Sequence, residues 1–101
     1  MHIETYPEVR KFISDLQPEQ RGKALRAIER LKAFGQLLPL PHSKKIDHKL
    51  WELRVRGKIQ VRLLYTFAHN KIHIVSGFVK KSPKIPRREL ELARQRIIDI
   101  A

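Results

Sequence analysis

The chain has 101 residues, 42% of them hydrophobic, which suffices for one core but not for two independently stable ones, so we expect a single domain spanning residues 1–101. It has 22 Lys and Arg against 10 Asp and Glu, a formal charge of +12, and this self-repulsion predicts an anionic partner. The lack of cysteine excludes disulfides and thiolate metal sites. Without a long apolar run or a signal peptide, a soluble cytoplasmic protein with no membrane partner is expected.

The first third of the chain has helical periodicity. Residues 2–5 are compatible with a short strand. A helix is expected to begin at Pro7 and a second at Pro18, because proline is favoured at the first position of a helix, and Gly35 ends the second. Apolar residues recur on one face of each helix. This pattern predicts an N-terminal helical hairpin with one apolar stripe to bury.

The rest of the chain alternates apolar and polar residues with a period of two. Residues 37–49 contain two prolines and are expected to form a connecting loop. Strands are predicted over 51–55, 59–67 and 72–79, and a final helix over 86–100. The expected fold class is α+β: the helical hairpin packs on a small twisted antiparallel sheet, followed by a C-terminal helix.

The first strand connection determines which residues face each other. If residues 56–58 form a three-residue turn with Gly57 in a left-handed conformation, Leu53 faces Val61 and the apolar faces coincide. A two-residue turn would instead set Leu53 against Gln60. Such a one-residue slip turns a whole strand face over, so the three-residue turn is predicted.

In this register Glu52 lies opposite Arg62, and Arg54 lies opposite Gln60. Counting through the next hairpin places Arg62 opposite Gly77, where no side chain obstructs the sheet. The polar face is therefore predicted to be a basic surface with one carboxylate. An ordinary cross-strand ion pair explains Glu52 and Arg62, but Glu52 is also suited to orient the guanidinium of Arg62 toward a phosphate.

Cations are concentrated on this face and on the segment after the last strand. The face carries Arg54, Arg56 and Arg62, and the segment carries Lys80, Lys81, Lys84 and Arg87. Each one alone is explained by a solvated surface. Together they are harder to dismiss, because cations at a helix start repel one another and the helix dipole, and an anion such as phosphate relieves both.

Other candidate residues carry weaker signals. Among the five histidines, His48 is the most plausible acid or base, although a loop histidine usually has no such role. No histidines have the spacing of zinc ligands, so neither a metal nor a cofactor is expected. Tyr65 and Trp51 fall on the apolar face and are predicted to belong to the core.

Three motifs of the chain resemble the RelE/ParE superfamily of toxin–antitoxin toxins, and within it the phage-derived Gp49-like, HigB-type branch. They are LWELR at 50–54, RLLY at 62–65 and GFVKKSPKIPRREL at 77–90, in that order between two helices and a C-terminal helix. The resemblance covers nearly the whole chain. It implies a RelE-like fold, a cognate antitoxin protein as partner and, on the RelE and HigB side, cleavage of mRNA in the ribosomal decoding site.

The resemblance also implies roles for particular residues. Arg54 and Arg62 match cations of the RelE-type cleft, and Lys81 matches the basic residue after its last strand. A tyrosine that some RelE members use near the C-terminus has no counterpart, and Arg87 lies closest to its place. This departure leaves the acid and base unassigned and favours a mechanism dominated by charge stabilisation.

Two active classes remain open at this stage, because one scaffold serves both. The first is a ribosome-dependent, metal-independent mRNA endoribonuclease in which Arg54, Arg62 and Lys81 act on the scissile phosphate. Around them Arg56, Lys80, Lys84, Arg87 and His48 would contact RNA or the ribosome. The alternative is a ParE-like toxin that binds and inhibits DNA gyrase without chemistry. An inactive member that only binds its antitoxin is a third option.

Overall fold

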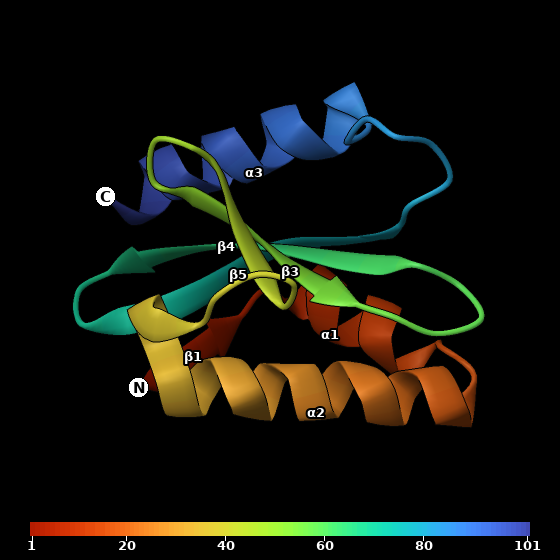
Figure 1. Cartoon of the computed structure of the whole chain (residues 1–101). Helices are drawn as coiled ribbons and strands as arrows, with labels where there is room; N and C mark the ends of the chain where they lie inside the picture. The colour runs from red at the N-terminus through yellow and green to blue at the C-terminus, as the bar shows by residue number, and fades with distance from the viewer.

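The computed structural model describes residues 1–101 and shows a mixed sheet covered by helices on both faces (Figure 1). In chain order the elements are β1 (His2–Thr5), α1 (Pro7–Ser14), α2 (Pro18–Phe34), a short 3-10 turn η1 (Gly35–Leu37), β2 (Ser43–Asp47), β3 (Leu50–Val55), β4 (Val61–Ala68), β5 (Lys71–Val79) and α3 (Arg87–Ile100). The α+β class is thereby confirmed. None of the helices has the length and apolarity needed to cross a membrane.

The five strands lie in the order β1-β5-β4-β3-β2, and the expectation of a purely antiparallel sheet is wrong. Strands β2 to β5 pair antiparallel, but β1 pairs parallel with β5, with Ile3 opposite Ile72. Thr5 ends β1, and the helices that follow carry the chain away before it returns to the sheet. Such a crossover permits parallel pairing.

The predicted N-terminal helical hairpin is also wrong. Helix α1 packs mainly against β5, whereas α2 packs against β3, and the two helices contact each other little. The apolar stripes explain this arrangement. Val9 and Ile13 of α1 and Ala24, Ala27 and Leu31 of α2 are buried in one core with the inner face of the sheet. Each helix therefore buries its stripe on strands instead of on the other helix.

A second, smaller core lies beneath α3 on the opposite face of the sheet. It contains Leu50, Leu64, Val75, Phe78 and Ala93. Because both faces of the sheet are covered, β4 is buried along most of its length, including positions predicted to be exposed. The middle of the sheet is therefore apolar on both faces. On the face that carries α3, the polar side chains lie outside the smaller core.

Two arginines hold α3 in place on the sheet. Arg96 donates a 2.7 Å hydrogen bond to the backbone carbonyl of Val75 and forms an ion pair of 3.3 Å with Glu8. Arg94 pairs with Asp47 of β2 at 2.6 Å. These contacts fix the second half of α3, and a 2.7 Å hydrogen bond from the Ser76 hydroxyl of β5 to Glu89 fixes its first turn, next to the basic segment.

The expected loop over residues 37–49 contains a strand, β2, at the edge of the sheet. Lys44 and Lys45 are exposed on it, and Ile46 is only half-buried, so the apolar alternation that signals a strand is missing. Edge strands often carry lysines, because charged side chains discourage pairing with other molecules. Because these lysines interrupt the apolar alternation, the sequence did not predict this strand.

The turn between β3 and β4 is wider than predicted. Val55 pairs with Val61, so five residues, 56–60, connect the strands instead of three. Gly57 sits directly on the side chain of Gln20, which leaves no room for a Cβ atom. Since the register differs from the prediction by two residues, every side chain keeps its predicted face. Arg54, however, now lies opposite Arg62.

The turn between β4 and β5 is a tight one at His69 and Asn70, both with positive φ. The register is as predicted from this turn to the pair Tyr65 and Ile74. Beyond this pair, the extra residue Val75 forms a bulge that shifts the register by one residue. Gly77 therefore pairs with Leu63 instead of Arg62 and faces the helices α1 and α2. The extra residue Val75 fills the core beneath α3.

We predict that Gly77→Ala destabilises the fold. A Cβ atom at Gly77 would lie 2.9 Å from Phe12 and 3.0 Å from Leu63, both packed in the core. Overpacking of this kind lowers the free energy of unfolding by about 1–3 kcal/mol. Urea unfolding followed by Trp51 fluorescence measures the loss.

Gly22→Ala is the matched control for this prediction. Its Cβ would meet only the flexible end of Arg26, at 3.3 Å, inside helix α2. Alanine is the better helix former by about 1 kcal/mol, so this variant should be more stable than the parent chain. Equal stability of the Gly77→Ala variant and the parent chain would contradict the packing described for β5.

Candidate RNA-binding site

Four charged side chains from three neighbouring strands meet on the face of the sheet that carries α3. Glu52 and Arg54 belong to β3, Arg62 belongs to β4, and Lys80 follows β5 directly. The backbone N–H of Lys80 donates a 2.7 Å hydrogen bond to the carbonyl of Gln60, so strand pairing continues past the end of β5. Alternation along each strand turns the four side chains to one face. We call these four residues the Glu52 cluster.

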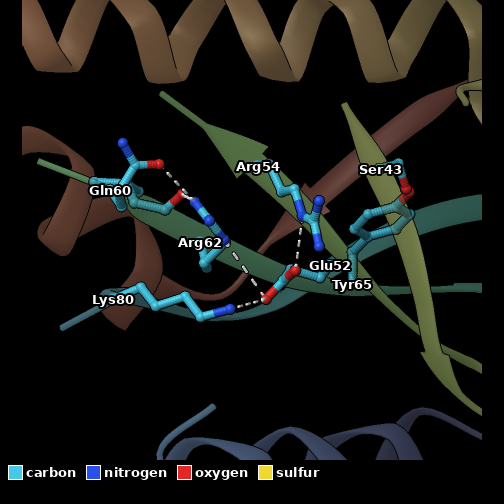
Figure 2. Close-up of polar contacts among 8 residues, drawn as sticks. Ser43, Glu52, Arg54, Gln60, Arg62, Tyr65 and Lys80 are labelled. Atoms are coloured by element: carbon cyan, nitrogen blue, oxygen red, sulfur yellow. Dashed lines mark hydrogen bonds and ion pairs between the residues drawn. The ribbon is translucent and has the colours of Figure 1, made fainter. Parts of the chain in front are cut away.

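The carboxylate of Glu52 lies at the centre of this cluster (Figure 2). Its side chain is only 1% exposed, and Arg54 Nε donates a 3.1 Å hydrogen bond to Oε1. The other oxygen, Oε2, lies 3.7 Å from Arg62 Nε and 3.9 Å from Lys80 Nζ. These two separations are ion pairs without hydrogen-bond geometry, so Oε2 accepts no hydrogen bond from the protein.

Three cations against one carboxylate leave the Glu52 cluster with a formal charge of 3 − 1 = +2. Burial disfavours the charged form of Arg62 and lowers its pKa below the ordinary value. The carboxylate of Glu52 opposes this shift, and the nearby cations Arg54 and Arg56 add to it. The arrangement therefore holds excess positive charge that a bound anion would stabilise.

Several N–H groups of the two arginines remain available to such an anion. Arg54 uses only Nε within the protein, so its terminal nitrogens make no hydrogen bond. Arg62 donates through Nη1 to the side chain of Gln60 at 3.4 Å and to the carbonyl of Val61 at 3.1 Å. A guanidinium carries five N–H donors in a planar fork that matches phosphate oxygens. The geometry is thus suited to a phosphate group.

The proposed cations on the segment after β5 lie in different surroundings. Lys80 joins the Glu52 cluster, with a side chain 17% exposed, whereas the neighbouring Lys81 is exposed and forms no ion pair. Lys84 is exposed on the connection to α3. Arg87 is the first residue of α3 and pairs with Glu91 at 3.0 Å, with its side chain 91% exposed. The structure therefore anchors Lys80 and leaves the other three in solvent.

Arg56 and His48 lie at opposite ends of β3. Arg56 follows β3 in the turn toward β4, close enough to Arg62 to affect its pKa. His48 lies in the turn before β3, beside the C-terminal part of α3. Six residues of extended chain separate it from Arg54, up to roughly 20 Å. The structure does not bring His48 to the Glu52 cluster.

The two aromatic residues predicted to be structural do lie in the core. Tyr65 is buried, stacks on Trp51 and shares a short hydrogen bond with the hydroxyl of Ser43. Burial raises the pKa of Tyr65, since the phenolate would be poorly solvated there. Neither ring faces the Glu52 cluster. No three His, Asp or Glu side chains come together in a way that could hold a metal ion.

One contact of the site was missed in the sequence. Gln60 holds Arg62 through its side chain and Lys80 through its carbonyl, whereas the sequence predicted it only as a strand residue opposite Arg54. The available signal was its position two residues before Arg62, which puts both side chains on the same side of an extended chain.

Comparison with known families adds to this geometry. A family model described as Phage derived protein Gp49-like (DUF891) matches residues 11–97. The matched span runs from α1 into the last turn of α3 and includes the entire Glu52 cluster. No curated protein is significantly similar to the chain in sequence.

We predict that Glu52→Gln weakens the fold by about 3 kcal/mol, because the substitution keeps the shape of the side chain but leaves three cations without their counter-charge. Sodium sulfate should restore more stability than sodium chloride of equal ionic strength, since a divalent anion can occupy the site. Urea unfolding in each salt measures both effects.

Glu91→Gln is the control for the loss of one carboxylate. Glu91 pairs with Arg87 on the surface of α3, and such exposed pairs contribute about 0.5 kcal/mol or less. If the two variants lose the same stability, the Glu52 carboxylate is not the electrostatic centre described here.

Proposed function

The chain belongs to the Gp49-like family, within the RelE/ParE-like toxins of toxin–antitoxin systems, and from this premise we propose that it is a ribosome-dependent mRNA endoribonuclease. The observation that carries the proposal is the Glu52 cluster. Three cations on adjacent strands converge on one buried carboxylate and keep a net positive charge with unused N–H donors. Phosphodiester cleavage needs such stabilisation, because negative charge accumulates on the phosphate oxygens in the transition state.

The proposed reaction is an internal transfer within the RNA strand. The 2′-OH of one ribose loses its proton and attacks the adjacent phosphorus, the bond from phosphorus to the 5′ oxygen of the next nucleotide breaks, and that oxygen takes up a proton. The products are a 2′,3′-cyclic phosphate and a 5′-OH end. Arg54, Arg62 and Lys81 would hold the scissile phosphate and stabilise its developing charge.

Glu52 acts in this scheme as a positioning residue. Its carboxylate fixes Nε of Arg54 and attracts Nε of Arg62, so both guanidinium groups are held in place while the terminal nitrogens of Arg54 remain without a partner in the protein. A rigid, prearranged donor set is worth more than flexible surface cations, because it needs no reorganisation during the reaction. Lys80 adds positive charge from the third strand, next to the exposed Lys81.

No side chain is assigned as general acid or base. His48 lies at the far end of β3, and Arg87 stands where some RelE-type toxins have a tyrosine. A guanidinium is a poor proton acceptor, since it stays protonated in proteins. We therefore propose that charge stabilisation and correct placement of the 2′-OH carry most of the rate enhancement, with the proton passing to solvent or to a ribosomal group.

The partners follow from the charge and the family. Lys84, Arg87 and Arg56 are exposed around the Glu52 cluster and would contact neighbouring phosphates of mRNA or ribosomal RNA. A toxin of this group is paired with an antitoxin. We expect the antitoxin to be acidic where it touches this surface, because binding of an acidic segment would relieve the same excess charge.

We predict that Arg62→Ala abolishes mRNA cleavage and toxicity in a chain that still folds, with a lower free energy of unfolding because the buried Glu52 loses one partner. Arg62 is the central cation of the site, and losing one such group reduces phosphoryl-transfer rates by about 100-fold or more. Mapping of mRNA 5′ ends after induction measures cleavage, and codon-phased cuts in translated messages are expected for the parent chain only. Circular dichroism checks the fold.

Arg10→Ala serves as the control, because it removes an exposed arginine of α1 on the other side of the molecule. It should cleave mRNA like the parent chain. A fully toxic Arg62→Ala variant would reject the assignment. Linearised plasmid and DNA-damage signalling without cut messages would instead identify a gyrase inhibitor, and no effect on growth would identify an inactive member.

The neighbouring lysines give a second prediction. Lys81 is exposed without an ion pair, so Lys81→Ala should reduce cleavage and leave the free energy of unfolding within about 0.5 kcal/mol of the parent value. Lys80 faces the buried carboxylate, so Lys80→Ala should reduce both cleavage and stability. Ribosome-dependent cleavage in a purified translation system and urea unfolding measure the two quantities. If Lys81→Ala cleaves normally, the catalytic role belongs to Lys80 alone.

A further inference from the structure

A second cationic feature lies between α2 and the end of β3. It is a hollow of about 300 Å³ with nine lining residues, among them the cations Lys23, Arg26, Arg30, Arg54 and Arg56. We call it the α2 hollow. Three of its cations stand on α2 at positions i, i+3 and i+7, and this spacing places them on one side of the helix. Five of the nine lining residues are Lys or Arg, and none is acidic.

Most of this charge has no partner within the protein. Arg26, Arg30 and Arg56 form no ion pair, and Lys23 has only the exposed Glu19, at 3.7 Å. Arg30 Nη1 lies 3.4 Å from His42 Nδ1, a contact between two nitrogen groups that adds no negative charge. Cations gathered around a concave surface without an acid repel one another, so the free hollow favours binding of an anion.

Arg54 connects the α2 hollow with the Glu52 cluster. Its Nε donates to Glu52, and the residue is also one of those that line the hollow. Figure 2 shows Arg54 between the ribbon of α2 and the carboxylate of Glu52. An anion bound in the hollow and a phosphate at the Glu52 cluster would therefore both lie near Arg54. A polyanionic strand with regularly spaced charges fits this arrangement better than a single small anion.

We propose that the α2 hollow is a second phosphate subsite, which binds the RNA strand next to the nucleotides held at the Glu52 cluster. Three of its nine lining residues, Ala27, Pro41 and Val55, are apolar and five are cations, so the lining suits a polyanion better than the apolar centre of a typical protein partner. Arginine, the commonest cation of the hollow, matches phosphate oxygens with a planar pair of donors. This subsite deepens the proposed function and rests on it.

The test uses binding of RNA without cleavage. The probe is a fluorescently labelled single-stranded 2′-O-methyl oligoribonucleotide, which lacks the attacking hydroxyl, and fluorescence anisotropy measures its affinity over a series of salt concentrations. The variant Lys23→Ala/Arg26→Ala/Arg30→Ala removes the α2 cations. Each lost phosphate contact changes the slope of log affinity against log salt by about 0.7 for single strands, so the slope should fall in magnitude by about 2.

The control is the variant Arg10→Ala/Lys11→Ala/Lys71→Ala, which removes the same charge from surfaces outside the hollow. It should keep nearly the parent slope. If both variants lose the same slope and affinity, only the total charge matters and the proposal is overturned. It is also overturned if the α2 variant binds the oligonucleotide normally but binds the antitoxin more weakly, because the hollow would then be a protein interface.

The outcome separates this inference from the proposed function. A chain that leaves no cut messages in cells, yet loses the predicted salt slope in the α2 variant, would refute the nuclease and keep the phosphate subsite. Codon-phased cuts together with an unchanged slope would refute the subsite and keep the nuclease.

Discussion

The burial of one carboxylate among three cations determines how this protein is organised around its site. A buried charge is unstable unless it is paired, so Glu52, with a side chain 1% exposed, requires Arg54, Arg62 and Lys80 beside it. The three cations depend on the carboxylate in turn. Without the carboxylate, each of the three cations would repel the other two and the fold would be less stable. Glu52 therefore permits a concentration of positive charge that it cannot neutralise by itself.

The two cores decide where this cluster lies. The larger core between the sheet and α1 and α2 holds the strands in register, and the smaller core beneath α3 covers the middle of the other face. The Glu52 cluster occupies the part of that face at which β3 ends and β4 begins. The helix stays in place because Arg94 and Arg96 hold it on β2 and β5. Arg54 and Arg62 of the site thus stand on strands whose backbone is fixed by pairing on both sides, whereas Arg56, Lys80, Lys81 and Lys84 lie on the connections between elements.

The sequence predicted strands and helices correctly where one face of the element is apolar. The prediction failed where the packing or pairing of an element leaves no pattern in its side chains. Alternation from Trp51 onward located β3, β4 and β5, and because the error in the first hairpin was two residues, Arg54 and Arg62 still share a face. The bulge at Val75 left no sequence signal, since an apolar residue suits either core. Strand β2 was missed because its lysines point to solvent. The helical hairpin was wrong because an apolar stripe does not specify whether a helix or a sheet covers it.

Arg54 is the residue at which the structure adds most to the sequence. Alternation alone shows that it shares a face with Glu52, but not that it also lines a hollow with the cations of α2, which lie 24 to 31 residues earlier in the chain. Its single hydrogen bond to Glu52 leaves the terminal nitrogens unused, so it can serve an anion on either side without losing its anchor. Arginine suits this position better than lysine, because its planar guanidinium offers several donors in fixed directions while Nε stays anchored. The continuity of positive surface from α2 to the Glu52 cluster depends on that difference.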